Sequence, residues 1–209
     1  MKLRAISLTG RNPAPYLPRI KEADILAMVL VAGVRQAQKA EPLGADIVIA
    51  VGYEGGGHLG RDDIGSLVLV RKVAQSVSVP VVASGGFGDG YGLIAALALG
   101  AEGIEMGTRF LATEECPIHA RYKQALLDFR ETDTTIMGWS LGVSGRVLAT
   151  GFSTVILAVN KKAVRRSDCC RFWQGREIAS GHLMESSART MSGSFKGSAS
   201  FSTVHPLGN

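Results

Sequence analysis

The sequence predicts an α/β protein built on a parallel β-sheet. Short, continuously apolar segments alternate with segments whose apolar residues recur at helical spacing, the loops between them are short, and two glycine-rich segments follow apolar runs. Strands that are apolar throughout are typical of parallel sheets, whose strands are joined by right-handed helical crossovers. The sheet is either doubly wound or part of a (β/α)8 barrel, of which four strand–helix units would make half.

Each element follows from a local pattern. Strands are expected where the sequence is continuously apolar, at residues 25–32, 46–51, 79–83 and 103–106. Helices are expected at residues 34–43, 66–76, 90–99 and 117–129, with a short additional helix around residues 19–23 after a proline-rich loop. Gly44 and Gly100 end two of these helices, because glycine takes up the left-handed conformation of a helix C-terminus without strain.

Composition limits the class of protein. A chain of 209 residues is one domain, or one domain with an appendage. Its longest apolar stretch, at residues 25–34, is too short to cross a bilayer, so no membrane partner is expected. Three cysteines do not make a disulfide framework, and a reducing cytoplasm is the expected location.

The charge divides the chain into two parts. Residues 1–148 hold 15 basic and 15 acidic residues, whereas residues 149–209 hold 8 basic and 3 acidic residues, so the net charge of +5 lies entirely in the tail. No aromatic stacking pattern accompanies it, and no nucleic-acid partner is expected. Serine also becomes frequent and periodicity fades in the tail. We therefore expect a partial barrel domain at residues 1–148 and a divergent tail at 149–209, with little order beyond about residue 175.

Two glycine-rich strand ends predict a phosphate site. Residues 83–90 and 106–109 each follow an apolar run and precede a helical pattern, and such loops can bind phosphate through backbone N–H groups. Thr108 adds a hydroxyl donor. Arg109 is either a phosphate ligand or a partner of Asp89 or Glu105.

A third strand end, residues 52–58, carries one histidine among glycines. The imidazole of His58 suits proton transfer near neutral pH, although a lone histidine is more often a surface or hydrogen-bonded residue. Glu54 and the pair Asp62 and Asp63 are candidate neighbours of His58, or else solvated loop charges. No set of histidine, cysteine and carboxylate residues has the spacing of a metal site.

Three runs in this order and spacing, residues 52–60, 83–90 and 100–113, resemble the nitronate monooxygenase (2-nitropropane dioxygenase) family. The resemblance extends from about residue 10 to residue 148. It implies an FMN-dependent (β/α)8 barrel that oxidises alkyl nitronates with O2 to a carbonyl compound and nitrite.

The resemblance also assigns roles by position. His58 corresponds to the active-site histidine beside the flavin, where it would bind or deprotonate the substrate. The residues that would contact FMN, several of them around its phosphate, are Gly56, Gly85, Gly86, Glu105, Met106, Gly107 and Thr108. The family usually has glutamine where Val51 and Glu105 stand, and a carboxylate near a phosphate is unfavourable unless it points away.

The family's barrel has about four strands before the first strand expected here. The chain is therefore expected to be a fragment without the N-terminal half of the barrel, completed by a homodimer or by a complementing barrel half. Two alternatives stay open. One is an NAD(P)H-dependent flavin reductase of enoyl thioesters or quinones on the same barrel, and the other is a non-catalytic fragment that needs a partner.

Overall fold

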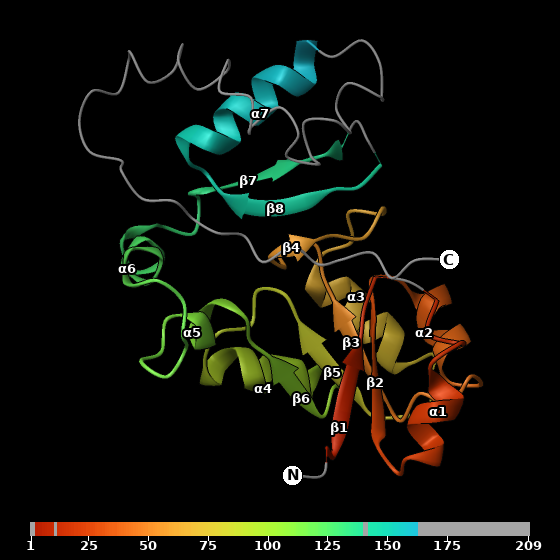
Figure 1. The fold of residues 1–209 in the computed structure, drawn as a ribbon. Coiled ribbons are helices and arrows are strands. Elements are labelled where there is room, and N and C mark those ends of the chain that lie inside the picture. Colours follow the sequence, from red (N-terminus) through yellow and green to blue (C-terminus); the bar gives the residue numbers. More distant parts are fainter. Residues whose placement is uncertain (1–2, 11, 140–141, 163–209) are drawn as a thin grey trace. The chain divides into compact units, whose positions relative to one another are not determined.

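The computed structural model describes residues 3–10, 12–139 and 142–162, and the tail expected at 149–209 lies outside the described residues from 163 onwards. Residues up to Lys162 form one compact unit. Its main feature is a parallel sheet of five strands in the order β1-β2-β3-β5-β6 (Figure 1). The strands are β1 (Ala5–Leu8), β2 (Leu26–Val31), β3 (Ile47–Val51), β5 (Val81–Ser84) and β6 (Gly103–Glu105).

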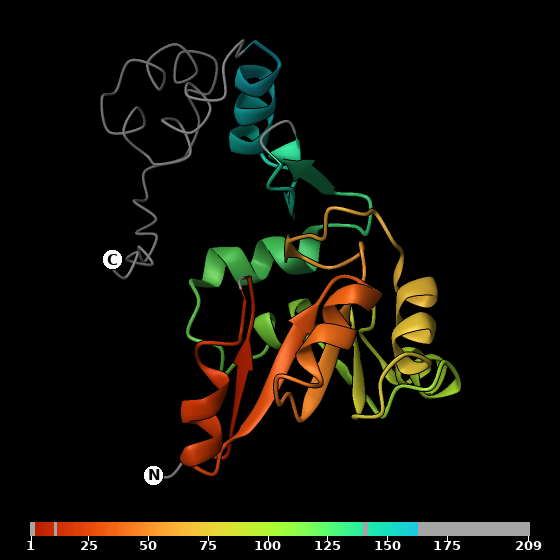
Figure 2. The ribbon, with the colours of Figure 1, turned by 90° about the vertical axis from the view of Figure 1, so that its right-hand side faces the viewer.

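The strand order argues against one of the two expected architectures. Each strand pairs in parallel with the next parallel strand along the chain, and Figures 1 and 2 show them running side by side. A doubly wound sheet reverses its strand order at a switch point, and this sheet has no such reversal among its described strands. The doubly wound alternative is therefore wrong.

Helices connect the strands at the expected places. They are α1 (Leu17–Glu22), α2 (Val34–Ala40), α3 (Ser66–Ala74) and α4 (Gly90–Ala98). Two N-termini are fixed by carboxylates: Asp89 accepts a 2.8 Å hydrogen bond from the N–H of Gly92 at α4, and Glu54 accepts one of 2.8 Å from the N–H of Ser66 at α3. These elements and the four expected strands are confirmed to within a few residues.

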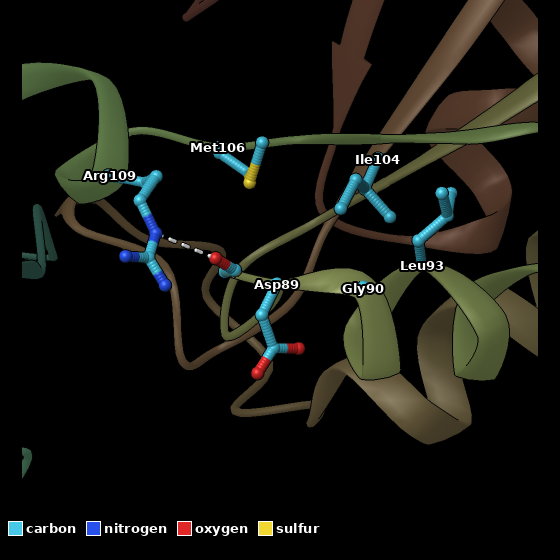
Figure 3. Close-up of a pocket in the computed structure, with 7 residues that line it drawn as sticks. Asp89, Gly90, Leu93, Ile104, Met106 and Arg109 are labelled. Atoms are coloured by element: carbon cyan, nitrogen blue, oxygen red, sulfur yellow. Dashed lines mark hydrogen bonds between the residues drawn. The ribbon is translucent and has the colours of Figure 1, made fainter.

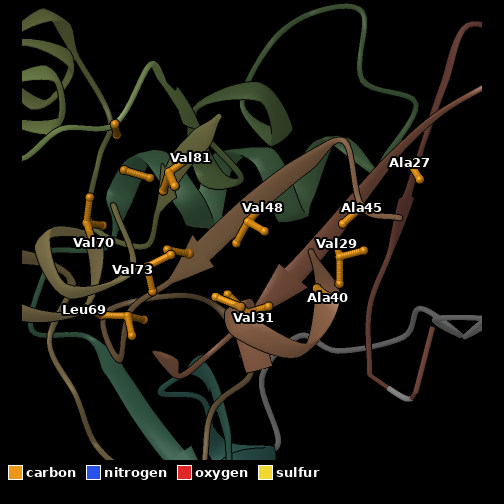
Figure 4. Close-up of a cluster of buried hydrophobic side chains, with 14 of the residues drawn as sticks. Ala27, Val29, Val31, Ala40, Ala45, Val48, Leu69, Val70, Val73 and Val81 are labelled. Atoms are coloured by element: carbon orange, nitrogen blue, oxygen red, sulfur yellow. The ribbon is translucent and has the colours of Figure 1, made fainter. Parts of the chain in front are cut away.

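The core lies between one face of the sheet and this helix layer (Figure 4). Val29, Val48 and Val81 are aligned by the strand register, and all three are buried. Leu69, Val70 and Val73 of α3 pack in the same cluster. Burying a side chain of this size stabilises the fold by about 1.5–3 kcal/mol. The aligned valines of three neighbouring strands thus pack with α3 in one core.

Several elements were not expected from the sequence. Among them are the two-residue strand β4 (Gly57–His58) and the strands β7 (Thr134–Met137) and β8 (Gly145–Leu148), which form an antiparallel sheet in the order β4-β8-β7. Helices α5 (Thr108–Leu111) and α6 (Ala120–Asp128) follow β6, and α6 confirms the helix expected at residues 117–129. Helix α7 (Gly151–Lys162) packs against β7.

Candidate functional site

The candidate residues follow three neighbouring strands. Gly56 and His58 come after β3, Gly85 and Gly86 after β5, and the run 105–108 begins at the last residue of β6. The three strands are adjacent and parallel, so their carboxyl ends meet at one edge of the sheet. This edge is where a parallel α/β sheet binds ligands.

The first two loops are in direct contact. Gly85 and Gly86 have φ values of +88° and +82°, a left-handed conformation that favours glycine. A Cβ atom at Gly85 would lie 3.0 Å from both the carbonyl oxygen of Gly52 and the nitrogen of Gly55. No side chain fits at residue 85, because the backbone of the loop after β3 closes against it.

A hydrogen-bonded pair joins these loops to helix α3. The hydroxyl of Ser66 lies 2.6 Å from the carbonyl oxygen of Gly85 and 2.8 Å from Oε2 of Glu54. Oε2 of Glu54 also accepts the hydrogen bond from the Ser66 N–H. Glu54 therefore caps α3 through both donors of one serine, a contact between residues 12 positions apart that no local pattern predicts.

Other glycines leave room for a ligand. An added Cβ at Gly56 or at Gly107 would meet no heavy atom within 4 Å. Gly107 has a φ of −89°, which any residue adopts, so the fold does not itself require glycine there. Bare backbone in open space beside the left-handed turn at residues 85–86 fits a cofactor that approaches the main chain closely.

The loop after β6 is fixed to the loop after β5 by Arg109. Its Nε donates a 2.9 Å hydrogen bond to the carbonyl oxygen of Gly88 (Figure 3). Within residues 3–10, 12–139 and 142–162 no carboxylate lies within ion-pair distance of this guanidinium, so the pairing with Asp89 or Glu105 considered from the sequence is not formed.

An open cavity of about 450 Å³ lies beside Arg109. Figure 3 shows Leu93 and Ile104 at one end of it and Arg109 at the other, with Met106 between them. Of the expected cofactor residues only Met106 lines this cavity. The remaining expected cofactor residues lie on the loops at the strand ends, outside its lining.

His58 lies on β4 and is exposed. Its strand pairs with β8, where His58 lies opposite Gly145, and the N–H of Leu59 donates a 2.9 Å hydrogen bond to the carbonyl oxygen of Ser144. Its imidazole forms no hydrogen bond or ion pair with any other residue that the structure describes. Neither Glu54 nor Asp62 and Asp63 pairs with it, so the imidazole is available to a ligand.

Arg146 of β8 holds the histidine loop in place. Its Nη2 donates to the carbonyl oxygen of Tyr53 at 3.1 Å, and its Nη1 donates to Oγ1 of Thr134 at 3.0 Å. The guanidinium carbon lies 5.7 Å from the centre of the Tyr53 ring, which stands nearly perpendicular to the Trp139 ring in a T-shaped contact. Nε of Arg146 is buried without a hydrogen-bond partner in the described part of the chain. No local pattern in the sequence marks Arg146.

The family can now be assigned. The family model described as nitronate monooxygenase matches residues 2–169, which is most of the chain. This chain belongs to the nitronate monooxygenase family. The match confirms the resemblance found from the three runs, and the family consists of FMN-dependent oxidoreductases.

The similar proteins include a nitronate monooxygenase and proteins with other names. A probable nitronate monooxygenase of Staphylococcus saprophyticus is 36% identical over 71% of this chain and 44% of its own length. A hydroxy-methyl-oxo-octahydroindene-carboxyl-CoA dehydrogenase of Rhodococcus jostii is 41% identical over 71% of this chain and 41% of its own length. The solved structure of FabK from Thermotoga maritima is similar with a TM-score of 0.75 at 38% identity, covering 87% of this chain and 55% of that one.

The chain thus spans about half the length of the relatives that it matches. Among the described residues, no helix is both long and apolar enough to cross a membrane. The same residues contain no group of three or more histidine, cysteine or carboxylate side chains that could hold a metal ion.

Proposed function

We propose that this chain binds FMN and serves the oxidation of alkyl nitronates by O2 to a carbonyl compound and nitrite. The observation that carries the proposal is that three strand-end loops are held together and leave the backbone at Gly56 and Gly107 uncovered. Gly85 is locked against the loop after β3, while Gly56 and Gly107 face open space beside it. The family assignment supplies the class of reaction.

The chain's own groups would hold the cofactor. Backbone N–H groups at Gly85, Gly86 and Gly107 and the hydroxyl of Thr108 are the donors suited to a phosphate. Gly56 and Met106 would contact other parts of FMN. Glu105 ends β6 beside these donors, and its charge would oppose the phosphate.

His58 is the proposed catalytic residue. When bound, FMN would supply the redox chemistry between the nitronate and O2. An exposed imidazole with no partner in the described structure can bind the anionic substrate as a cation or move a proton as a neutral base. The pairing of β4 with β8 orients the main chain of His58 for this role.

We further propose that the sheet is part of a (β/α)8 barrel completed by another chain, either a second copy or a separate barrel half. Within the described residues, β1 and β6 each pair on one side only. Unpaired strand edges favour pairing with another chain. Light scattering on the purified protein distinguishes a dimer from a monomer that awaits a partner. We propose the cytoplasm as the location.

A second candidate function has specific support. The Rhodococcus jostii relative is named as a dehydrogenase of a CoA compound. An NAD(P)H-dependent flavin reductase of enoyl thioesters or quinones would use the same loops for FMN. NADH oxidation in the presence of an enoyl thioester, without turnover of nitronates, would favour this candidate.

The deciding experiment begins with the absorption spectrum of the purified protein, before and after FMN is added. Flavin bands that stay with the protein through gel filtration are expected. Turnover of a simple alkyl nitronate is then compared between the natural chain and His58→Ala, which should lower kcat by about 10²–10⁴-fold and leave the affinity for FMN unchanged.

His119→Asn is the matched control. Nδ1 of His119 caps α6 by accepting from the N–H of Arg121 at 3.1 Å, and asparagine preserves such a cap. Its kcat should equal that of the natural chain. A protein that takes up no FMN would instead support the non-catalytic fragment, and equal loss of kcat in both variants would remove the special role of His58.

A further inference from the structure

We propose that Glu54 and Ser66 are positioning residues that aim the backbone N–H of Gly86 at the phosphate of the cofactor. The inference rests on the proposed function, since it assigns these residues to the same FMN site. Neither of them is among the residues expected to contact FMN.

The serine of the pair is buried, the glutamate is exposed, and Oε2 of the glutamate is hydrogen-bonded to the serine. Ser66 is 4% exposed and stands at the first position of α3. Its hydroxyl faces two acceptors at short range, the carbonyl oxygen of Gly85 at 2.6 Å and Oε2 of Glu54 at 2.8 Å, with the carbonyl oxygen of Ser84 at 3.4 Å. A hydroxyl has a single proton to donate, so the two nearer oxygens share it.

Glu54 fixes the serine from the other side. Its Oε2 also accepts the Ser66 N–H at 2.8 Å, so one carboxylate oxygen receives both donors of the serine. A negative charge at the N-terminus of the nine-residue helix α3 is favourable because of the helix dipole. The serine is thereby held by its backbone and by its side chain.

Glycines make the space in which the pair sits. A Cβ at Gly52 would lie 2.0 Å from Oγ of Ser66, and a Cβ at Gly65 would lie 3.2 Å from Oε1 of Glu54. At Gly86 a Cβ would lie 3.3 Å from Cβ of Glu54. Backbone therefore lies close to Ser66 at Gly52 and close to Glu54 at Gly65 and Gly86, so neither side chain can move toward these glycines.

Because the peptide bond is planar, the hydrogen bond to the carbonyl of Gly85 also fixes the direction of the N–H of Gly86. The carbonyl of Gly85 and the N–H of Gly86 belong to one trans peptide plane, in which they point in opposite directions. When Ser66 holds the carbonyl oxygen of Gly85 on the side of α3, the N–H of Gly86 is directed away from α3. A turn of two left-handed glycines has many alternative conformations, so it needs such an external hold.

The test uses Ser66→Ala, Glu54→Ala and Glu54→Gln, with Ser76→Ala as the matched control. The hydroxyl of Ser76 donates to the carbonyl oxygen of Val73 at 2.9 Å just after α3, at the opposite end of that helix from Ser66. Two quantities are measured: the Kd for FMN from quenching of flavin fluorescence, and the ¹⁵N order parameters of Gly85 and Gly86 without FMN.

Ser66→Ala and Glu54→Ala should each raise the Kd for FMN about tenfold, the effect of one hydrogen bond, and lower the order parameter of Gly86. Glu54→Gln should keep the Kd within about threefold, because an amide still accepts from Ser66. Ser76→Ala should change neither quantity. Should Ser66→Ala fail to fold, Ser66→Cys keeps the volume with a weaker donor and should raise the Kd severalfold.

The two measurements separate the inference from the proposed function. If the natural chain takes up no FMN, the proposed function fails, and the order parameters still decide whether the pair holds the turn. If the natural chain binds FMN and Ser66→Ala matches Ser76→Ala in both quantities, the positioning role is overturned. A lower Tm without any change at Gly86 or in the Kd would likewise overturn it and leave the pair a purely structural role.

Discussion

The guanidinium of Arg146 donates a 3.1 Å hydrogen bond to the carbonyl oxygen of Tyr53, a residue 93 positions earlier in the chain. Tyr53 begins the loop that reaches His58, and Gly57 pairs with Arg146 in the antiparallel sheet. The position of the proposed catalytic histidine therefore depends on a strand that follows all three cofactor loops in the sequence.

Replacing this arginine tests the dependence. Arg146→Lys keeps the charge but loses the planar fork that reaches both Tyr53 and Thr134, so kcat should fall about tenfold and the free energy of unfolding by about 1–3 kcal/mol. The Kd for FMN should stay the same. Arg130→Lys is the control, because Arg130 is exposed and its ion pair with Asp133 lies at the surface. Equal kcat in the two variants would contradict the role of Arg146.

Two glycines of the β6 segment test whether glycine at residue 107 serves FMN binding or the stability of the fold. An added Cβ meets nothing within 4 Å at Gly103 or at Gly107. Gly107→Ala should leave the Tm nearly unchanged and raise the Kd for FMN at least tenfold, because the methyl group enters the proposed phosphate position. Gly103→Ala, at the other end of the strand, should leave both unchanged. Thermal unfolding and FMN titration give the two quantities, and an unchanged Kd for Gly107→Ala would place the phosphate elsewhere.

Glu105 offers a prediction of improved binding. Glu105 is the last residue of β6, two positions before Gly107 in the proposed phosphate loop, so Glu105→Gln should lower the Kd for FMN severalfold at low salt. The gain should shrink as salt screens the repulsion. Glu102→Gln, immediately before the same strand, removes an equal charge and is the control. If both variants bind FMN alike, the repulsion is a general effect of net charge.

Asp46 makes stability depend on pH. Burial raises the pKa of this carboxyl group, but hydrogen bonds from Lys21 and from the N–H of Ala27 outweigh that effect and hold the pKa below its ordinary value of 3.8. A lowered pKa in the folded state contributes stability above pH 3.8 that is lost as the pH falls through the folded value.

Asp46→Asn should therefore lower the free energy of unfolding by about 1 kcal/mol or less at neutral pH, since Lys21 is partly exposed. The difference from the natural chain should disappear below the folded pKa of Asp46. Urea unfolding at neutral pH and in acid gives both values. A difference that persists in acid would mean that asparagine disturbs the packing instead.

The sequence alone predicted what depends on local patterns. The apolar run of β3 and the glycines at residues 85 and 86 mark a buried strand and a turn by composition, and the structure has both. Strand β1 was missed, because its four residues AISL include a polar residue and lie in no long apolar run.

The missed parts of the site depend on contacts between distant residues. The sequence around Glu54 suggests a neighbour of His58 or a solvated charge, whereas its partner Ser66 lies 12 positions on and is recognised only once β3 and α3 are packed. The two-residue strand β4 has no periodicity of its own and exists only because β8 pairs with it. Neither pairing leaves a trace in the nearby residues.

The order in which the ribosome delivers these segments has a consequence for the newly made chain. The strands of the parallel sheet emerge one after another, and each can join a neighbour that has already left the tunnel. Arg146 emerges only after all of them, when the glycine turns have already been made. During synthesis, the segment around His58 therefore lacks the hydrogen bond from Arg146 to Tyr53 until residue 146 has left the tunnel.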